Sequence, residues 1–239
     1  MPTADPIEFE FKLVQTENLE RFTEMAELCF GLTNFSSDYF KWKYLDNPAG
    51  KVVAFEALHE GKPAGFYGVI PEFYIINGER VKIHQSMDTM THPNYQKRGL
   101  FTRLANLTYD RVAETEGGVN LVGIAGGNSL YGLINKLNWK NIHNYEYFFV
   151  QRTWFSARNV FQRTEKVSCE PATEMTASLR DYFSQRERSP AAISNDLSAD
   201  FINWRVFHNP YKNFKVLQVL EGGAIIGICV YNLDEKGRC

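Results

Sequence analysis

The stretch Thr91–Leu104, THPNYQKRGLFTRL, decides the fold and most of the expected chemistry. Residues 81–90 before it have strand character, and a helix-type apolar pattern follows it. A strand that turns tightly into a helix leaves the first amides of the helix unpaired, at the positive end of the helix dipole. Gly99 lets a ligand approach the backbone closely, and the basic pair at 97–98 adds charge. The stretch therefore predicts a phosphate site, although an ordinary strand-to-helix turn with a solvated basic pair fits the same pattern.

This stretch resembles the acyl-CoA-binding motif of the GNAT N-acetyltransferase superfamily, which is a strand followed by Arg/Gln-x-x-Gly-x-Gly/Ala at the start of a helix. Gln96, Gly99 and Phe101 stand at the three key positions, and a proline and an aromatic residue precede them as expected. Phe101 departs from the small residue that is usual there. It would either narrow the pyrophosphate loop or turn into the core. The resemblance covers roughly residues 8–150 and rests mainly on residues 88–104.

The resemblance implies where acetyl-CoA, or another acyl-CoA, would bind as a co-substrate. Its pantetheine arm would lie between the motif strand and the next parallel strand, held by the backbone of Met90 and Thr91. The pyrophosphate would be lined by a continuous run of residues: Gln96, Lys97, Arg98, Gly99, Leu100 and Phe101, with Thr102 close by. For Met90 and Leu100 we expect only backbone contacts, because core packing accounts for their side chains.

The resemblance also implies direct attack of an amine on the thioester, which needs a proton acceptor and a proton source for the leaving thiolate. Asp88 on the motif strand is the first candidate base, and its alternative role is a cap or a hydrogen bond to the nearby turn. Glu72, at the end of its strand, is the second, with an ordinary surface carboxylate as the alternative. His84 and His92 are further candidate bases by their chemistry.

A second landmark of the family is a later helix, here within residues 126–139, GGNSLYGLINKLNW. The family pattern has an Asn and then a Tyr a few residues before Lys-Leu-Gly-Phe. Asn128 stands near the expected Asn, but Ile134 occupies the place of the Tyr that acts as an acid. Tyr131 lies three residues earlier on the same helical face. It would supply the proton from one turn away, or it would be a buried aromatic residue.

The apolar periodicity predicts a mixed sheet with helices packed on it. The expected strands are residues 8–14, 51–58, 64–70, 73–76, 81–90, 120–125, 139–142 and 145–150. The expected helices begin after Asn18, at Ser36, after Gly99 and after Gly126. This α/β (α+β) order, with a mostly antiparallel central sheet flanked by helices, matches the GNAT fold.

The last third of the chain repeats an early segment at a constant offset of 162. Matching residues include the pairs Asp38/Asp200, Trp42/Trp204, Asn47/Asn209, Pro48/Pro210, Leu58/Leu220, Gly61/Gly223 and Gly65/Gly227. Chance similarity between two helix-hairpin units is the alternative. We expect an acyl-CoA-binding GNAT domain at residues 1–155 and a partial GNAT-like repeat at 156–239, of helices and a hairpin, joined by an irregular connector at 156–174. The repeat would pack on the first unit, cover a sheet edge or shape the acceptor cleft.

Composition excludes several classes of protein. A hydrophobic content of 44% supports a real core, and a net charge of -2 predicts no nucleic-acid partner. The longest apolar runs are far below the roughly 20 residues that cross a membrane, and the N-terminus lacks the pattern of a secretory signal. Four scattered cysteines without metal-ligand spacing predict a reduced, cytoplasmic protein without a metal site.

These observations predict a cytoplasmic acyltransferase. It would move an acetyl or short acyl group from acyl-CoA to a primary amine of a small molecule or sugar, and a homodimer is an open expectation. The first alternative is a non-catalytic GNAT-fold module that binds acyl-CoA or a protein partner. The second is an aminoacyl or peptidoglycan-type transferase built on paired GNAT domains, which would need a groove for charged tRNA. No basic stripe in the sequence supports that groove.

Overall fold

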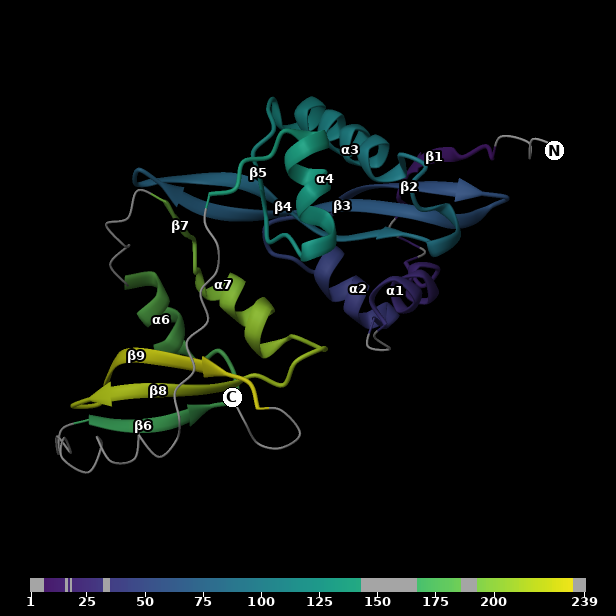
Figure 1. The fold of residues 1–239 in the computed structure, drawn as a ribbon. Helices are drawn as coiled ribbons and strands as arrows, with labels where there is room; N and C mark the ends of the chain where they lie inside the picture. The colour runs from purple at the N-terminus through teal and green to yellow at the C-terminus, as the bar shows by residue number, and fades with distance from the viewer. Residues whose placement is uncertain are drawn as a thin grey trace, which may run out of the picture.

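The computed structural model describes residues 7–15, 17, 19–31, 35–142, 167–185 and 193–233. They form two sheets (Figure 1). The larger has six strands in the order β1-β2-β3-β4-β5, with β7 also paired to β3, and the smaller has the order β6-β8-β9. The predicted fold class is confirmed, because the central sheet is mostly antiparallel and helices flank it.

The larger sheet is built from two consecutive hairpins and one parallel strand. Its main strands are β1 (Glu10–Leu13), β2 (Val53–His59), β3 (Lys62–Ile76), β4 (Glu79–Thr91) and β5 (Leu121–Gly123). The turns at 60–61 and 77–78 have positive φ at both central residues, as tight hairpins require. Strand β3 runs unbroken through Pro71, so the predicted strands 64–70 and 73–76 are one. Only β4 and β5 pair in parallel.

Two pairs of helices cover the two faces of this sheet (Figure 1). They are α1 (Phe22–Phe30) and α2 (Ser37–Tyr44) on one face, and α3 (Leu100–Glu116) and α4 (Gly127–Leu137) on the other. Strand alternation sends Phe66 to the first face and Tyr67 to the second, and both side chains are fully buried. Helices α1 and α3 end at Gly31 and Gly117, both in the left-handed conformation. The predicted cap Asn18 lies outside the described residues.

A second unit follows residue 166. It contains β6 (Val167–Ala172), α6 (Ala177–Gln185), α7 (Ala199–Ile202) continued by a π-helical turn (Asn203–Phe207), β8 (Lys215–Glu221) and β9 (Ala224–Tyr231). Strand β6 corrects the prediction of an irregular connector at 156–174. This strand was not predicted because its sequence lacks the apolar alternation of a half-buried strand. Nearly all of its residues are exposed, and one of them is a proline. Residues 139–142, predicted as a strand, form none, and 145–150 lie outside the described residues, as does the predicted boundary at 155.

The repeat seen in the sequence is present in the structure. Strands β8 and β2 begin and end 162 residues apart, and each carries a bulge at the equivalent place, 57–58 and 219–220. Ser36 and Ser198, also 162 apart, each cap a helix by accepting a hydrogen bond from the backbone N–H three residues later. The coincidence of strand ends, bulge and cap at one offset favours a repeat over chance similarity between two helix-hairpin units.

The two units meet at the repeated tryptophans. Trp42 and Trp204 stack with ring centroids 5.0 Å apart. Trp42 Nε1 donates to the Trp204 carbonyl at 3.0 Å, and Trp204 Nε1 donates to the Trp42 carbonyl at 2.9 Å. In addition, β7 (Ile193–Asn195) pairs with β3 at residues 74–76, beyond the part of β3 that β2 covers. The second unit therefore packs on the first and covers a sheet edge, which are two of the three expected roles.

Candidate active site

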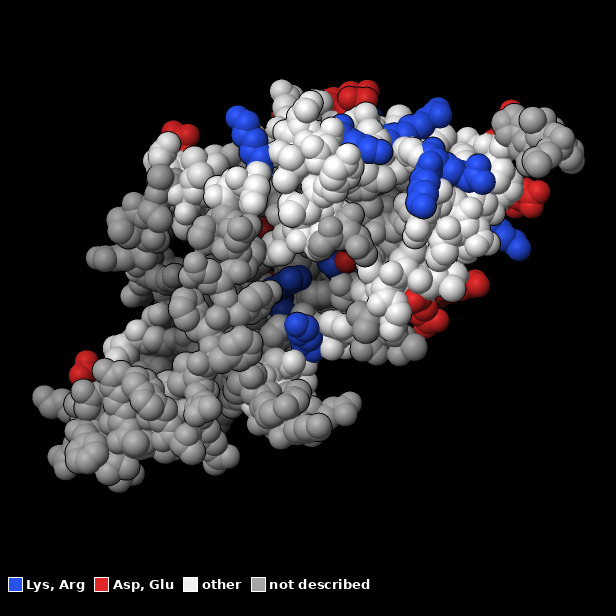
Figure 2. All heavy atoms as spheres, in the orientation of Figure 1, with Lys and Arg blue, Asp and Glu red and all other residues white. Residues whose placement is uncertain are grey.

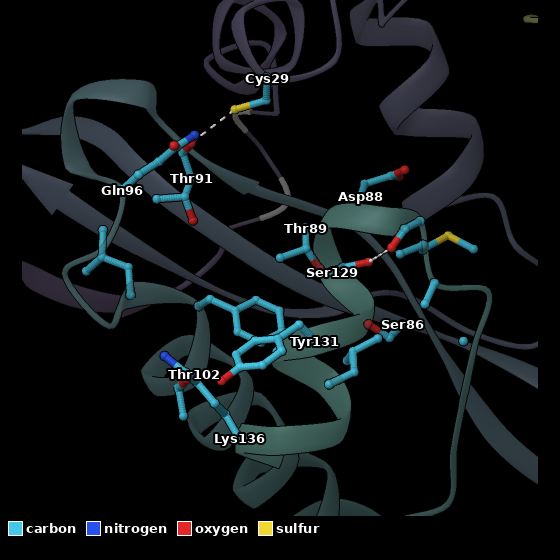
Figure 3. Close-up of a pocket in the computed structure, with 18 of the residues that line it drawn as sticks. Cys29, Ser86, Asp88, Thr89, Thr91, Gln96, Thr102, Ser129, Tyr131 and Lys136 are labelled. Atoms are coloured by element: carbon cyan, nitrogen blue, oxygen red, sulfur yellow. Dashed lines mark hydrogen bonds between the residues drawn. The ribbon is translucent and has the colours of Figure 1, made fainter. Parts of the chain in front are cut away.

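A cleft opens where two parallel strands part. Strands β4 and β5 pair from His84/Leu121 to Ser86/Gly123 and no further. Strand β4 continues to Thr91, while the chain after Gly123 leaves the sheet toward α4. The space between them has a volume of about 940 Å³ (Figure 3). It is large enough for a cofactor-sized ligand.

Strand β4 carries a bulge in the wall of this cleft. Phe66 faces Met90 and Gly68 faces Met87 in the β3–β4 ladder, so β4 has one extra residue between these pairs. Asp88 takes up the irregularity with a φ of 51°, in the left-handed region that non-glycine residues rarely adopt. Such strained backbone persists only where its surroundings fix it.

The side chain of Asp88 supplies part of that fixation. Lys43 Nζ lies 2.6 Å from Asp88 Oδ2, and the Tyr44 hydroxyl donates to the same oxygen at 3.0 Å. Lys43, only 5% exposed, also donates to the hydroxyl of Tyr39 at 2.8 Å. Burial lowers the pKa of Lys43, and the charge of Asp88 opposes this shift. Figure 3 shows the carboxylate turned away from Ser86 and Tyr131, toward α2, which carries both of its hydrogen-bond partners. The side chain of Asp88 therefore binds residues of α2, which differs from both alternatives, a cap and a hydrogen bond to the nearby turn.

The other end of the cleft is the turn that leads into α3. After the short 3-10 helix η1 (Pro93–Tyr95), Lys97 and Gly99 adopt left-handed φ values of 61° and 79°. The turn delivers the chain to α3 with the first amides of that helix unpaired. The cleft is lined here by Gln96, Lys97, Gly99, Leu100, Phe101 and Thr102. Figure 2 shows Lys and Arg side chains gathered on this face near the start of α3. The residues present therefore fit a diphosphate.

Three expected donor-binding residues differ from this group. Met90 is 1% exposed and does not line the cleft, so its side chain belongs to the core, whereas Thr91 lines the cleft. Arg98 is exposed and is not a lining residue. Asn128 lies in the first turn of α4, but its side chain is outside the described part of the chain.

The half-buried side chain of Phe101 packs against the core and also lines the cleft. Its ring meets Tyr67 edge to face at 5.8 Å, and a Cβ added at Gly132 of α4 would approach this ring to 2.8 Å. The missing side chain at Gly132 therefore makes room for the large residue that replaces the usual small one. No atom lies within 4 Å of a Cβ built at Gly99, so the Phe101 ring does not crowd this position of the turn.

The remaining candidate side chains lie in different surroundings. Tyr131 lines the cleft and is 67% exposed, so it is not a buried aromatic residue. Glu72 lies outside the cleft and is 6% exposed, so it is not a surface carboxylate either. Strand alternation places Glu72 on the α2 face of β3, where burial raises its pKa and the charges of Arg205 and Lys43 oppose the shift.

Neither histidine is a base facing the cleft. His84 is buried, outside the cleft lining, and burial lowers its pKa. His92 caps η1, because its Nδ1 accepts a hydrogen bond from the Asn94 N–H at 3.2 Å.

Several polar residues of the cleft are not predicted from the sequence, among them Cys29 and Ser86. Cys29 of α1 donates its thiol hydrogen to the Thr91 carbonyl at 3.4 Å, and burial raises the pKa of this thiol. Ser86 lies at the last β4–β5 pair, with its hydroxyl 2.7 Å from that of Tyr67. The only available signal for Ser86 was its place on the motif strand, two residues before Asp88.

The described residues contain neither a metal-binding cluster nor a membrane-spanning helix. No three His, Cys, Asp or Glu side chains gather there in a way that would hold a metal ion. No helix in this part of the chain has the length and apolar character needed to cross a membrane.

Comparison with known proteins adds family information to this geometry. The family model described as acetyltransferase (GNAT) domain matches residues 10–141, more than half of the chain. No curated protein matches.

Solved structures share the fold at low sequence identity. A conserved protein of unknown function from Enterococcus faecalis V583, described as a probable N-acyltransferase, superposes with a TM-score of 0.68 at 11% identity. The match covers 96% of this chain and 56% of that one, so this chain spans about half of that protein's length. An acetyltransferase of Trypanosoma brucei matches with a TM-score of 0.46 at 14% identity, over 60% of this chain and 100% of that one. Glucosamine-6-phosphate N-acetyltransferase of Arabidopsis thaliana matches with a TM-score of 0.45 at 15% identity, over 59% of this chain and 99% of that one.

Proposed function

Because this chain belongs to the GNAT acetyltransferase family, we propose that it moves an acetyl or short acyl group from acyl-CoA to a primary amine of a small molecule or sugar. The observation that carries the proposal is the cleft between the parting strands, which runs from the left-handed turn at 96–99 along β4 to its last pair with β5. An elongated ligand with an anionic end fits this shape and charge.

The donor would be held mainly by the backbone. Beyond its last pair with β5, the β4 backbone at Met90 and Thr91 would hydrogen-bond to the pantetheine amides, as an added strand does, and the Thr91 carbonyl would exchange the weak thiol hydrogen bond from Cys29 for this contact. The amides of the turn and of the first turn of α3, from Gln96 to Thr102, would hold the diphosphate, with Lys97 adding charge. Asn128 would stand on the opposite wall. Bound acyl-CoA would supply an acyl carbon activated by a thiolate leaving group.

The acceptor amine would approach from the side of α1 and α2. The Asp88 carboxylate is turned toward α2, and both of its hydrogen bonds go to Oδ2. Its Oδ1 would therefore receive the proton of the amine, directly or through water. Glu72, which lies outside the cleft, has no part in this scheme. The described cysteines are free thiols, which supports a reducing compartment such as the cytoplasm.

Calorimetric titration with acetyl-CoA tests this proposal. We expect micromolar binding, near -8 kcal/mol, followed by release of CoA thiol when a panel of amines and amino sugars is added. A folded protein that does not bind acetyl-CoA would contradict the proposal. Binding without turnover on any amine would favour the alternative, a non-catalytic module that senses acyl-CoA. That alternative gains support from Ile134, which stands where the family has its acidic Tyr.

Replacing Tyr131 with phenylalanine tests whether this residue, a candidate from the sequence, acts as the acid. We expect kcat to fall no more than a few-fold, because a phenol that is 67% exposed competes with water for any proton transfer. Steady-state kinetics of the wild type and Tyr131→Phe, with acyl-CoA binding measured in parallel, gives the answer. A loss of about a hundredfold or more in kcat at unchanged binding would instead make Tyr131 the acid.

A further inference from the structure

A chain of four polar side chains leads to the cleft, with the buried Tyr67 in its middle. The Ser86 and Tyr67 hydroxyl oxygens are 2.7 Å apart, and those of Tyr67 and Tyr109 are 2.6 Å apart. Trp139 Nε1 then donates to the Tyr109 hydroxyl at 3.1 Å. Tyr67 is fully buried, whereas Ser86 lines the cleft. The four residues come from β4, β3, α3 and the segment after α4, so folding brings them together from across the first unit.

The far end of this chain limits how its protons are arranged. An indole N–H can only donate, so the Tyr109 oxygen must accept from Trp139. Each hydroxyl both donates and accepts, and each can turn about its C–O bond. In one arrangement Ser86 donates inward to Tyr67. In the other, Tyr109 donates to Tyr67, Tyr67 donates to Ser86, and the Ser86 hydrogen points into the cleft. A negative charge in the cleft selects the second arrangement, and successive hydrogen bonds of one direction strengthen each other.

Ser86 stands at the closed end of the cleft. It pairs with Gly123 at the last rung of the β4–β5 ladder, directly before the strands part. Trp139 packs on this rung, since a Cβ added at Gly123 would lie 3.0 Å from its ring. The five steps along the strand from Ser86 to Thr91 span about 16 Å. A donor with its diphosphate at the turn before α3 therefore directs its thioester toward Ser86. This orientation rests on the proposed function.

We propose that Ser86 donates the hydrogen bond that stabilises the leaving thiolate, and that Tyr67 and Tyr109 are positioning residues that orient the Ser86 hydroxyl. In the reaction the amine nitrogen bonds to the acyl carbon, and the C–S bond breaks with its electron pair on sulfur. The surplus amine proton leaves through Asp88 or water, and the thiolate takes a proton from water on release. Ser86 keeps its own proton throughout. Its hydrogen bond replaces the acid that Ile134 does not supply.

Titration of the CoA thiol in its complex with the protein tests this role without needing an acceptor amine. The ultraviolet absorbance of the thiolate is followed against pH for the wild type and for Ser86→Ala, each saturated with CoA. We expect the pKa of the bound thiol to be about one unit higher in Ser86→Ala, because a hydrogen bond to a charged group is lost. Tyr67→Phe should raise the pKa by a smaller amount, and Ser86→Thr should keep the wild-type value. Ser129→Ala is the matched control, since Ser129 lines the same cleft but donates to the Gly126 carbonyl.

The outcomes separate this inference from the proposed function. Equal pKa values in the wild type and Ser86→Ala, both binding CoA, would overturn the role of Ser86 and leave the function intact. A folded wild type that does not bind CoA would overturn both. If Ser86→Ala does not fold, Tyr67→Phe decides, because it removes only the hydroxyl that orients Ser86. An unchanged thiol pKa in that variant would also overturn the inference.

The dependence of kcat on the leaving thiol gives a second test of whether Ser86 acts on the sulfur atom. We expect Ser86→Ala to lower kcat about tenfold with acetyl-CoA. The loss should nearly vanish with an acetyl thioester of an aryl thiol, whose thiolate is stable without a hydrogen bond. A purely structural role of Ser86 would lower the rates of both donors equally.

Discussion

Replacing Gly99 with valine is expected to weaken acetyl-CoA binding at least about a hundredfold, close to 3 kcal/mol. Gly99 has a φ of 79°, a conformation that a β-branched residue adopts only with strain. The turn must then change its course, and the first amides of α3 no longer converge on the site proposed for the diphosphate. Calorimetric titration measures the loss directly.

The same helix offers a matched control. Gly117 at the other end of α3 has a φ of 74°, and no atom lies within 4 Å of a Cβ built there or at Gly99. Gly117→Val therefore introduces similar strain into the same helix, away from the cleft. Urea unfolding should show similar losses of stability in the two variants, while only Gly99→Val loses acetyl-CoA binding. Equal affinities in the two variants would show that the turn at Gly99 does not hold the ligand.

Truncation of either repeated tryptophan is expected to destabilise the protein strongly. Trp42 and Trp204 are 6% and 5% exposed, stack on each other and exchange two hydrogen bonds. Replacing either with alanine removes a large buried ring and one donor, and leaves a carbonyl of the other residue without its partner. We expect each change to lower the free energy of unfolding by about 3–5 kcal/mol. Denaturant unfolding measures both values.

The double variant shows whether the two tryptophans act together. Because each single change already removes the stacking, Trp42→Ala/Trp204→Ala should lose less than the sum of the single losses, by about 0.5–3 kcal/mol. Arg180→Ala is the control for the second unit. It breaks an exposed ion pair with Asp200, which is worth at most about 1 kcal/mol. Strictly additive losses for the tryptophans would mean that this contact does not couple the two units.

The sequence predicts those features of the fold that depend on local chemistry. The glycine at 99 marks the start of α3, the Asn-Gly pair at 77–78 marks a hairpin, and Ser36 caps a helix. The repeated Trp-x4-Asn-Pro pattern reveals the second unit because it recurs at one constant offset. The first three signals lie in neighbouring residues, and the fourth is a local pattern that occurs twice.

Features that depend on distant residues escape such reasoning. Strands β6 and β7 exist because β8 and β3 offer them a ladder edge, and their own sequences show no apolar alternation. The partner of Asp88 is a lysine 45 residues away on α2, so the carboxylate looked free in the sequence. The hydroxyl chain behind Ser86 joins side chains from four separate segments, and no sequence pattern shows that these side chains meet. The sequence therefore identifies candidate bases, whereas their surroundings are known only from the structure.

The contact between the tryptophans has the form of an isologous interface, in which the same patch is used on both sides and each residue meets its own counterpart. Separate molecules that carry one copy of such a patch would pair through it as homodimers, to an extent set by their concentration. When one chain carries both copies of the patch, the two copies bind each other within the molecule, at an effective concentration that the fold sets. Duplication thus makes the pairing independent of how much protein is present, and a homodimer of this protein would have to form through a different surface.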